Sequence, residues 1–195
     1  MNSRQRVLNV LNHRIPDRVP IDFGGHISGI HKKAYLELIR YLGIKDELKI
    51  FDPVQQLAEP CEELLQRFHA DIRYIYPNSS NIQNTNDSFI DEFGVTWKLP
   101  EEYSDYMNVL RHPLTDLSVS EIKDYSFPGI NSKKQFAGIR EKALNISNNG
   151  SYALSTSIGG SIFETCSNLR GIEKWFIDTK ENLSLCETLI DKILK

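Results

Sequence analysis

Apolar residues recur along much of the chain at intervals of three and four positions, a spacing that places them on one face of a helix. Capping residues support two of the helices that this spacing predicts: Gly43 follows the second, and Asp52 with Pro53 opens the third. Helices are predicted over residues 3–16, 30–42 and 52–68, in a stretch opening at Ser132, and in a last segment that carries Leu183, Cys186, Leu189, Ile190 and Ile193.

Shorter runs of β-branched and aromatic residues, closed by turn-forming residues, predict strands. Three such runs lie at 18–22, 72–76 and 152–156. Glycine pairs follow the first run, at 24–25, and the third, at 159–160. Because these strands are separated by helical stretches, we expect a parallel sheet covered by helices, an α/β fold.

Residues 84–116 follow a different pattern. The runs 89–90 and 95–97 flank a turn at 92–94, which predicts a β-hairpin, and 107–110 adds a third strand. Ser118 and Glu121 then have the spacing of a capping box at the start of a short helix. The hairpin is therefore expected to be an insertion between the second and third strands of the main body.

The strand count sets the expected architecture. A closed (β/α) barrel typically needs about 250 residues, and this chain of 195 residues offers three runs that fit barrel strands. The last predicted helix reaches Lys195 without a stop signal. We therefore expect one domain over 1–195, an open partial barrel of three parallel strands. Its uncovered sheet edge predicts a companion chain that completes the barrel.

Composition excludes several classes of function. The 23 Lys and Arg residues against 26 Asp and Glu give a net charge of -3 without a block of one sign, so neither nucleic acid nor an anionic membrane is an expected partner. No run approaches the roughly 18 apolar residues of a membrane span, and no signal-peptide core follows the polar N-terminus. Three distant cysteines fit buried thiols in a reducing cytoplasm.

Several segments, in order, carry a resemblance to a known family. The segments are MNSRQRVLNVLNHRIPDRVPIDFGG, FDPVQQLAEPCEELLQRFHADIR, DEFGVTW, HPL at 112–114 and GGSIFETCSNLRGIEKWFID. Together they resemble the N-terminal part of the uroporphyrinogen decarboxylase (URO-D) superfamily, and in particular its corrinoid-linked methyltransferases. The resemblance implies a distorted TIM-like (β/α)8 barrel with its site at the C-terminal face of the strands.

That superfamily contains two chemistries. Its decarboxylases remove acetate carboxyl groups from a tetrapyrrole, holding it with arginines after the first strand and an aspartate after the second. This chain has no arginine in the loop 23–29 and carries Tyr76-Pro77-Asn78 after the second strand. Ser167 stands where the decarboxylase tyrosine falls. Uroporphyrinogen decarboxylase therefore remains the alternative, and the resemblance favours the methyltransferase.

The methyltransferases move a methyl group between a corrinoid on a partner protein and a thiol activated on zinc. Their zinc ligands, one His and two Cys, fall in the later half of the barrel. No His-x-Cys pair occurs in this chain. We therefore expect it to bind neither cofactor alone and to be inactive alone. A non-catalytic subunit that pairs with a second chain is a further alternative.

Loops that follow barrel strands build active sites, so the segment 23–29 is the best candidate for lining one. Gly24 and Gly25 would let backbone N–H groups approach an anionic ligand, or would make only a tight turn. His26 is a candidate hydrogen-bond donor or acid/base group, or a solvated histidine. Asp22 ends the predicted strand, where it would bind substrate or pair with Arg18.

Three later residues share this positional argument. Tyr76 and Asn78 follow the second predicted strand, and Glu164 follows the third. Glu164 has a structural alternative, since a carboxylate at a helix N-terminus stabilises its own helix. The sequence does not identify the methyl donor or the acceptor thiol.

Overall fold

The computed structural model describes residues 1–78, 83–85, 87–100, 105–129, 132–156 and 161–194. It is a mixed α/β structure with small sheets, and none of them closes into a barrel within these ranges. The chain forms two units, each built from two separated stretches: 1–79 with 133–158, and 80–132 with 159–195. No helix in the described ranges is long and apolar enough to cross a membrane.

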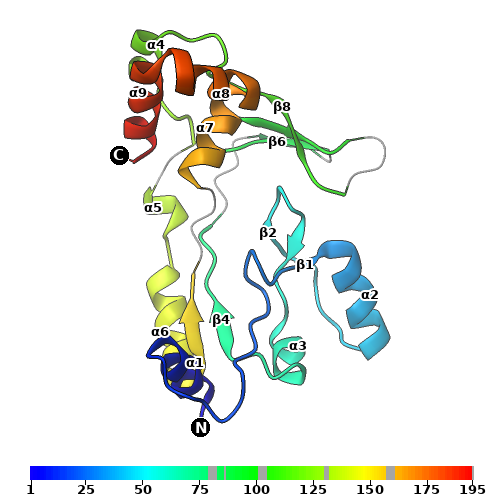
Figure 1. Ribbon diagram of the computed structural model, residues 1–195. Helices are drawn as coiled ribbons and strands as arrows, with labels where there is room; N and C mark the ends of the chain where they lie inside the picture. The colour runs from blue at the N-terminus through cyan, green and yellow to red at the C-terminus, as the bar shows by residue number, and fades with distance from the viewer. Residues whose placement is uncertain (79–82, 86, 101–104, 130–131, 157–160, 195) are drawn as a thin grey trace. The chain divides into compact units, whose positions relative to one another are not determined.

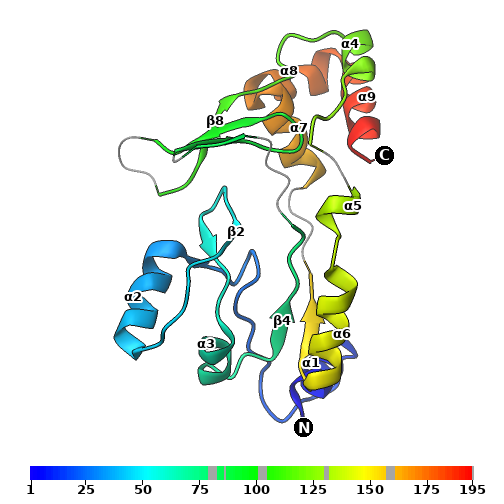
Figure 2. The same ribbon diagram turned by 180° about the vertical axis from the view of Figure 1, so that it is seen from behind.

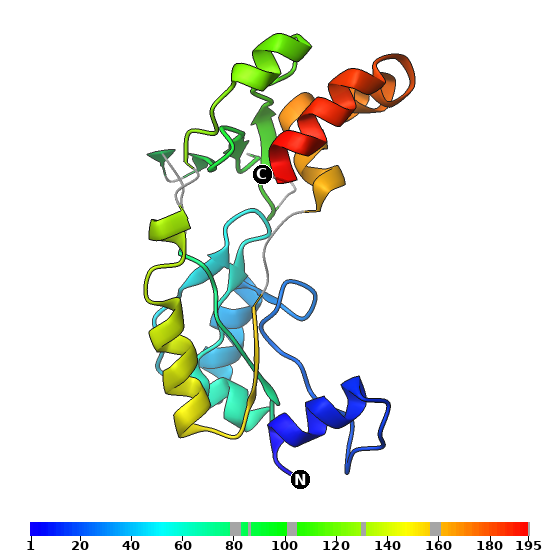
Figure 3. The same ribbon diagram turned by 90° about the vertical axis from the view of Figure 1, so that its left-hand side faces the viewer.

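A pair of parallel strands lies at the centre of the first unit, where β4 and β9 run side by side (Figure 1). The predicted strands at 72–76 and 152–156 are thus confirmed, and Ile72, Arg73 and Tyr74 pair in register with 153–155. Figure 3 shows α6 beside this pair. The elements of this unit are α1 (Ser3–Leu11), β1 (Ile30–His31), α2 (Lys32–Leu42), β2 (Ile50–Asp52), β3 (Leu57–Ala58), α3 (Glu62–Arg67), β4 (Ile72–Tyr74), α6 (Ile139–Asn149) and β9 (Ala153–Ser155).

The predicted first strand, 18–22, is wrong. This segment carries no strand, because Pro20 removes a backbone donor that a ladder would need. It nevertheless runs beside the start of β4, where Asp71 N–H donates to the Ile21 carbonyl at 2.8 Å. Within the described residues the parallel sheet therefore has two strands, where three were expected.

The predicted helix over 52–68 is also wrong. Its first part is a tight turn between β2 and β3, in which Asp52 Oδ1 accepts hydrogen bonds from the N–H groups of Val54 and Gln55, each at 2.9 Å. Gln56 has φ 55°, outside the helical region. Pro60 would clash inside a continuous helix, so α3 begins only at Glu62.

The antiparallel sheet of β1, β3 and β2 carries α2 beside it and forms the core of the first unit. The core side chains are Tyr35, Ile39, Ile44, Ala58 and Leu64. Helix α2 starts two residues later than expected, with His31 as its N-cap, and the predicted Gly43 cap is confirmed at φ 70°. This small core holds the turn 52–56 and β2 in place.

Two other helix ends differ from the expectation. Asn2, not Ser3, caps α1, which ends at Leu11 before Pro16 is reached. The helix opening at Ser132 is short (α5, Ser132–Gln135), and Gly138 at φ 74° separates it from α6. A left-handed residue cannot continue a helix, which explains the break.

The second unit contains a four-stranded antiparallel sheet and a helical cluster, in which α4 lies along α9 (Figure 2). The predicted hairpin is confirmed: Phe89 pairs with Trp97, and Trp97 pairs with Val109 on the third strand. The capping box of Ser118 and Glu121 is confirmed as well. The elements are β5 (Gln83–Asn84), β6 (Ser88–Ile90), β7 (Thr96–Lys98), β8 (Asn108–Arg111), α4 (Val119–Asp124), α7 (Ile162–Arg170), α8 (Ile172–Glu181) and α9 (Leu183–Leu194).

Candidate functional site

The first unit contains two adjoining cavities, of about 400 and 550 Å³. We call them together the β4 cleft. The residues common to both linings are Glu59, Tyr74, Tyr76, Asn145 and Ile146. Volumes in this range suit small-molecule ligands. The β4 cleft is therefore the best candidate site among the described residues.

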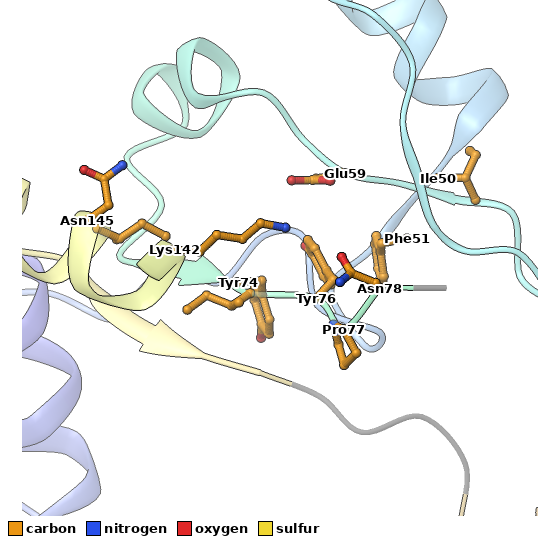
Figure 4. A pocket seen from close by; sticks show the side chains of 11 residues that line it. Ile50, Phe51, Glu59, Tyr74, Tyr76, Pro77, Asn78, Lys142 and Asn145 are labelled. Atoms are coloured by element: carbon orange, nitrogen blue, oxygen red, sulfur yellow. The ribbon is translucent and has the colours of Figure 1, made fainter. Parts of the chain in front are cut away.

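The carboxyl end of β4 supplies the aromatic wall of the cleft. Tyr74 and Tyr76 lie two positions apart, so both rings project to the same side, and their centroids are 6.0 Å apart at an interplanar angle of 12°. Phe51, from β2, stacks on Tyr76 at 4.3 Å and 18°. Figure 4 shows this wall with the residues of the smaller cavity around it.

The loop after residue 21 reaches the same tyrosines. Tyr74 Oη donates to Asp22 Oδ2 at 2.9 Å, and Ser28 Oγ donates to the same oxygen at 2.9 Å. Tyr76 Oη donates to the Gly24 carbonyl. The expected pairing of Asp22 with Arg18 is wrong, because that arginine binds a different carboxylate. The structure thus brings Asp22, Gly24 and Tyr76 together.

Gly25 permits this close approach. A Cβ at this position would lie 2.5 Å from Tyr74 Oη and 2.6 Å from Tyr74 Cζ. Its N–H donates to Ser28 Oγ at 3.0 Å. The glycine is therefore required by the tyrosine ring packed against it.

We expect Gly25→Ala to lower the free energy of unfolding of the first unit by about 1–3 kcal/mol, since the added methyl group overpacks the contact with Tyr74. Urea titration monitored by far-UV circular dichroism measures this change. In a Tyr74→Ala background the same substitution should cost much less. An equal cost in both backgrounds would contradict the assignment.

His26 lies at the edge of this cluster. Its Nε2 is 3.5 Å from Asp52 Oδ2, and its ring meets Phe51 edge-on with centroids 5.2 Å apart. Its Nδ1 is buried and has no hydrogen-bond partner among the described residues. The expectation of a freely solvated histidine therefore does not hold, because the side chain packs against β2.

Burial is the largest cause that raises the pKa of the Tyr76 hydroxyl, followed by the negative charges of Glu59, Tyr74 and Asp22. Burial, and then the Asp22 carboxylate, also raise the pKa of Tyr74. Both hydroxyls consequently stay protonated at neutral pH, and each donates its proton within the loop–strand contact. They position the wall and leave their oxygen lone pairs available to a ligand.

The remaining predicted residues have structural partners. Asn78 lines the smaller cavity, but its Nδ2 donates to the carbonyls of Lys134 and Ala137, which ties the chain after β4 to α5. Glu164 belongs to the second unit, where it forms the capping box of α7 with Ser161. The structural role predicted for Glu164, stabilisation of its own helix, is thus confirmed. The glycines 159 and 160 lie outside the described residues.

A zinc ion does not fit the residues that the structure describes. They include no group of three His, Cys, Asp or Glu side chains that could hold a metal. Burial raises the pKa of the Cys166 thiol to about 12 and raises that of Cys186, whereas a zinc ligand must be a thiolate. Cys61, the third thiol, lines the larger cavity at the start of α3.

The contributors to the cleft that were missed from the sequence include Phe51, Glu59 and Lys142. Glu59 belongs to the segment 52–68 that was taken for one helix, and Phe51 directly precedes that segment. The third lies on α6, and no local pattern connects it to residues some eighty positions earlier. Tyr74 could have been found, because it alternates with Tyr76 along a predicted strand.

Comparisons with known proteins give no relative: no family model, no curated protein and no solved structure matches the chain.

Proposed function

We propose that this chain contributes substrate-binding loops to a URO-D-superfamily protein of the corrinoid-linked methyltransferase type. The observation that carries the proposal is the contact of the first loop with the end of β4, through Asp22 with Tyr74 and Gly24 with Tyr76. In (β/α) barrels the loops after successive strands meet in this way at the active face. The corrinoid and the zinc would be supplied outside the described residues.

The finer fold assignment is part of the proposal. β4 and β9 are parallel and adjacent, and α6 lies in the connection between them, as a barrel requires of neighbouring strands. The antiparallel sheet of β5–β8 lies in the same connection and corresponds to the proposed insertion. We propose that the chain is the N-terminal portion of such a barrel and does not transfer methyl groups by itself.

Decarboxylation of uroporphyrinogen is less well supported. A substrate with many carboxylates needs free guanidinium groups. Arg73, the arginine that lines the β4 cleft, donates from Nε and Nη2 to Glu62 at 2.7 and 2.9 Å. Its guanidinium carbon also lies 3.6 Å from the ring centroid of Tyr152. This arginine is therefore engaged within the protein.

Equilibrium dialysis against a small thiol, 2-mercaptoethanesulfonate, and, separately, uroporphyrin tests the proposal. We expect retention of the thiol, which is of the acceptor class of these methyltransferases, and not of uroporphyrin, because the cleft is small and offers aromatic contacts without free arginines. Tyr76→Ala should weaken retention of the thiol about tenfold, equivalent to about 1.4 kcal/mol. Tyr41→Ala is the matched control, since that side chain is 86% exposed on α2. Retention of uroporphyrin alone would favour the decarboxylase, and retention of neither would overturn the proposal.

A further inference from the structure

The smaller cavity of the β4 cleft carries two opposite charges that do not neutralise each other. Glu59, just before α3, and Lys142, on α6, are the charged residues of its lining. Within the described part of the chain neither forms an ion pair or a side-chain hydrogen bond. Figure 4 shows the two side chains reaching toward the cavity from different elements.

Of the other charged side chains that line the cleft, Asp46, Glu62 and Arg73 are engaged within the protein, whereas Lys49, in the larger cavity, forms no ion pair or side-chain hydrogen bond among the described residues. Glu62 pairs with Arg73, and Asp46 accepts the hydroxyl proton of Tyr35 at 2.5 Å. Of the residues that the structure describes, Glu59 and Lys142 are thus the two charges without a partner that share the smaller cavity. Two separated charges of opposite sign favour a ligand that carries both signs.

The wall between the two charges is aromatic. The stacked rings of Phe51, Tyr76 and Tyr74 offer an apolar surface, and their hydroxyl groups stay neutral because burial raises the pKa of both tyrosines. Aromatic rings attract cations, and they contact alkyl groups on an ammonium better than water does. The wall therefore favours an alkylated ammonium on the Glu59 side.

A ligand of one sign would fit poorly. A simple anion on Lys142 would lie near the carboxylate of Glu59, and a simple cation on Glu59 would lie near the ammonium of Lys142. Each arrangement leaves one of the two charges repelled or without a partner. A cavity of about 400 Å³ has room for a small molecule that satisfies both.

We propose that the β4 cleft binds a small zwitterion, with its carboxylate on Lys142 and its alkylated ammonium between Glu59 and the aromatic wall. The proposal rests on the proposed function in one respect, because it takes this cleft for the substrate site. It adds the chemical class of the substrate.

Calorimetric titration with three probes of similar shape tests this inference. Glycine betaine carries both charges, 3,3-dimethylbutanoate replaces the ammonium nitrogen with carbon, and choline lacks the carboxylate. We expect glycine betaine to bind at least about tenfold more tightly than either of the others. Equal affinities for the three probes, or no binding of glycine betaine, would overturn the inference.

Two substitutions assign the charges. Lys142→Met should remove the preference for glycine betaine over choline, and Glu59→Gln should remove its preference over 3,3-dimethylbutanoate. Both side chains are exposed, so the fold should survive, and Lys45→Met is the matched control on the same unit. Unchanged glycine betaine binding in Lys142→Met would contradict the assignment.

The same preparation distinguishes the two proposals. Retention of 2-mercaptoethanesulfonate without a preference for the zwitterion would overturn this inference and leave the proposed function supported. Zwitterion binding without retention of the thiol would support the ligand class and count against a methyltransferase role.

Discussion

Replacing Asp71 with alanine is expected to lower the free energy of unfolding of the first unit by about 3–5 kcal/mol, because two arginines would lose a buried partner. The carboxylate is fully buried and lies within 2.5 Å of Arg6 Nη1 and 2.7 Å of Arg18 Nη1. It also accepts from the backbone N–H of Ile21 at 2.8 Å. Hydrogen exchange of residues 70–75, read by mass spectrometry, measures the loss.

The effect should depend on pH in a defined direction. Burial raises the pKa of Asp71, but hydrogen bonds from Ile21 N–H and from Ser3, Arg18 and Arg6 together lower it below its usual range. A carboxylate whose folded pKa is depressed stabilises the fold above its unfolded pKa of about 3.9, and loses that contribution as the pH falls through the folded pKa. The difference between wild type and variant should therefore shrink in acid.

Asp17→Asn is the matched control, because Asp17 binds the same arginine, Arg6, at the surface. Arg6 is buried but Asp17 is 42% exposed, and asparagine keeps one acceptor for the guanidinium, so this variant should lose much less stability than Asp71→Ala. A loss for Asp71→Ala no greater than that of the control would contradict the role of the buried cluster.

Asp178→Ala is expected to destabilise the second unit by a similar amount, about 3–5 kcal/mol. Arg170 Nε donates to Asp178 Oδ2 at 2.6 Å, and Arg170 Nη1 donates to the carbonyls of Leu114 and Leu117 at 2.7 and 3.0 Å. Both partners of the ion pair are about nine-tenths buried. The guanidinium of Arg170 connects the chain after β8 to α7. Loss of the Asp178 carboxylate would leave this buried guanidinium without its ion-pair partner.

Tryptophan fluorescence during urea unfolding measures this loss selectively, since Trp97 and Trp175 are the two tryptophans of the chain and both lie in the second unit. Asp116→Asn is the matched control. Its partner Lys174 also lies on α8, but the pair is exposed, so the cost should be below about 1 kcal/mol. Similar midpoints for the two variants would refute the assignment.

The strands at 72–76 and 152–156 could be predicted because both are short, β-branched or apolar, and bounded by turn residues. The hairpin and the capping box of α4 could be predicted as well, because each depends on residues close together in the sequence. The helix over 52–68 failed for an instructive reason. Leu57, Leu64 and Leu65 are indeed buried, but they belong to a strand and a separate short helix whose combined spacing imitates one helical face.

The site could be predicted only in part. Tyr76 and Asn78, predicted from their place after a strand-like run, line the cleft, whereas Asp22 and Gly24 contact its tyrosines without lining it. Their partners could not be found, since the hydrogen bonds from Tyr74 and Tyr76 each span 52 positions. Lys142 comes from a helix whose place beside β4 is set by the pairing with β9. Long-range packing of this kind leaves no periodic trace in the sequence.

The parallel pairing of β4 with β9 has a consequence for how the chain is made. Ile72 must wait for Ala153, about 80 residues later, before its strand acquires a partner. At about 5–20 residues per second, a ribosome needs some 4–16 seconds to add that length. During this interval the backbone N–H and C=O groups along that edge of β4 have no strand partner, so we expect that rapid folding of the intervening antiparallel sheet, or a chaperone, keeps the edge from pairing with other chains.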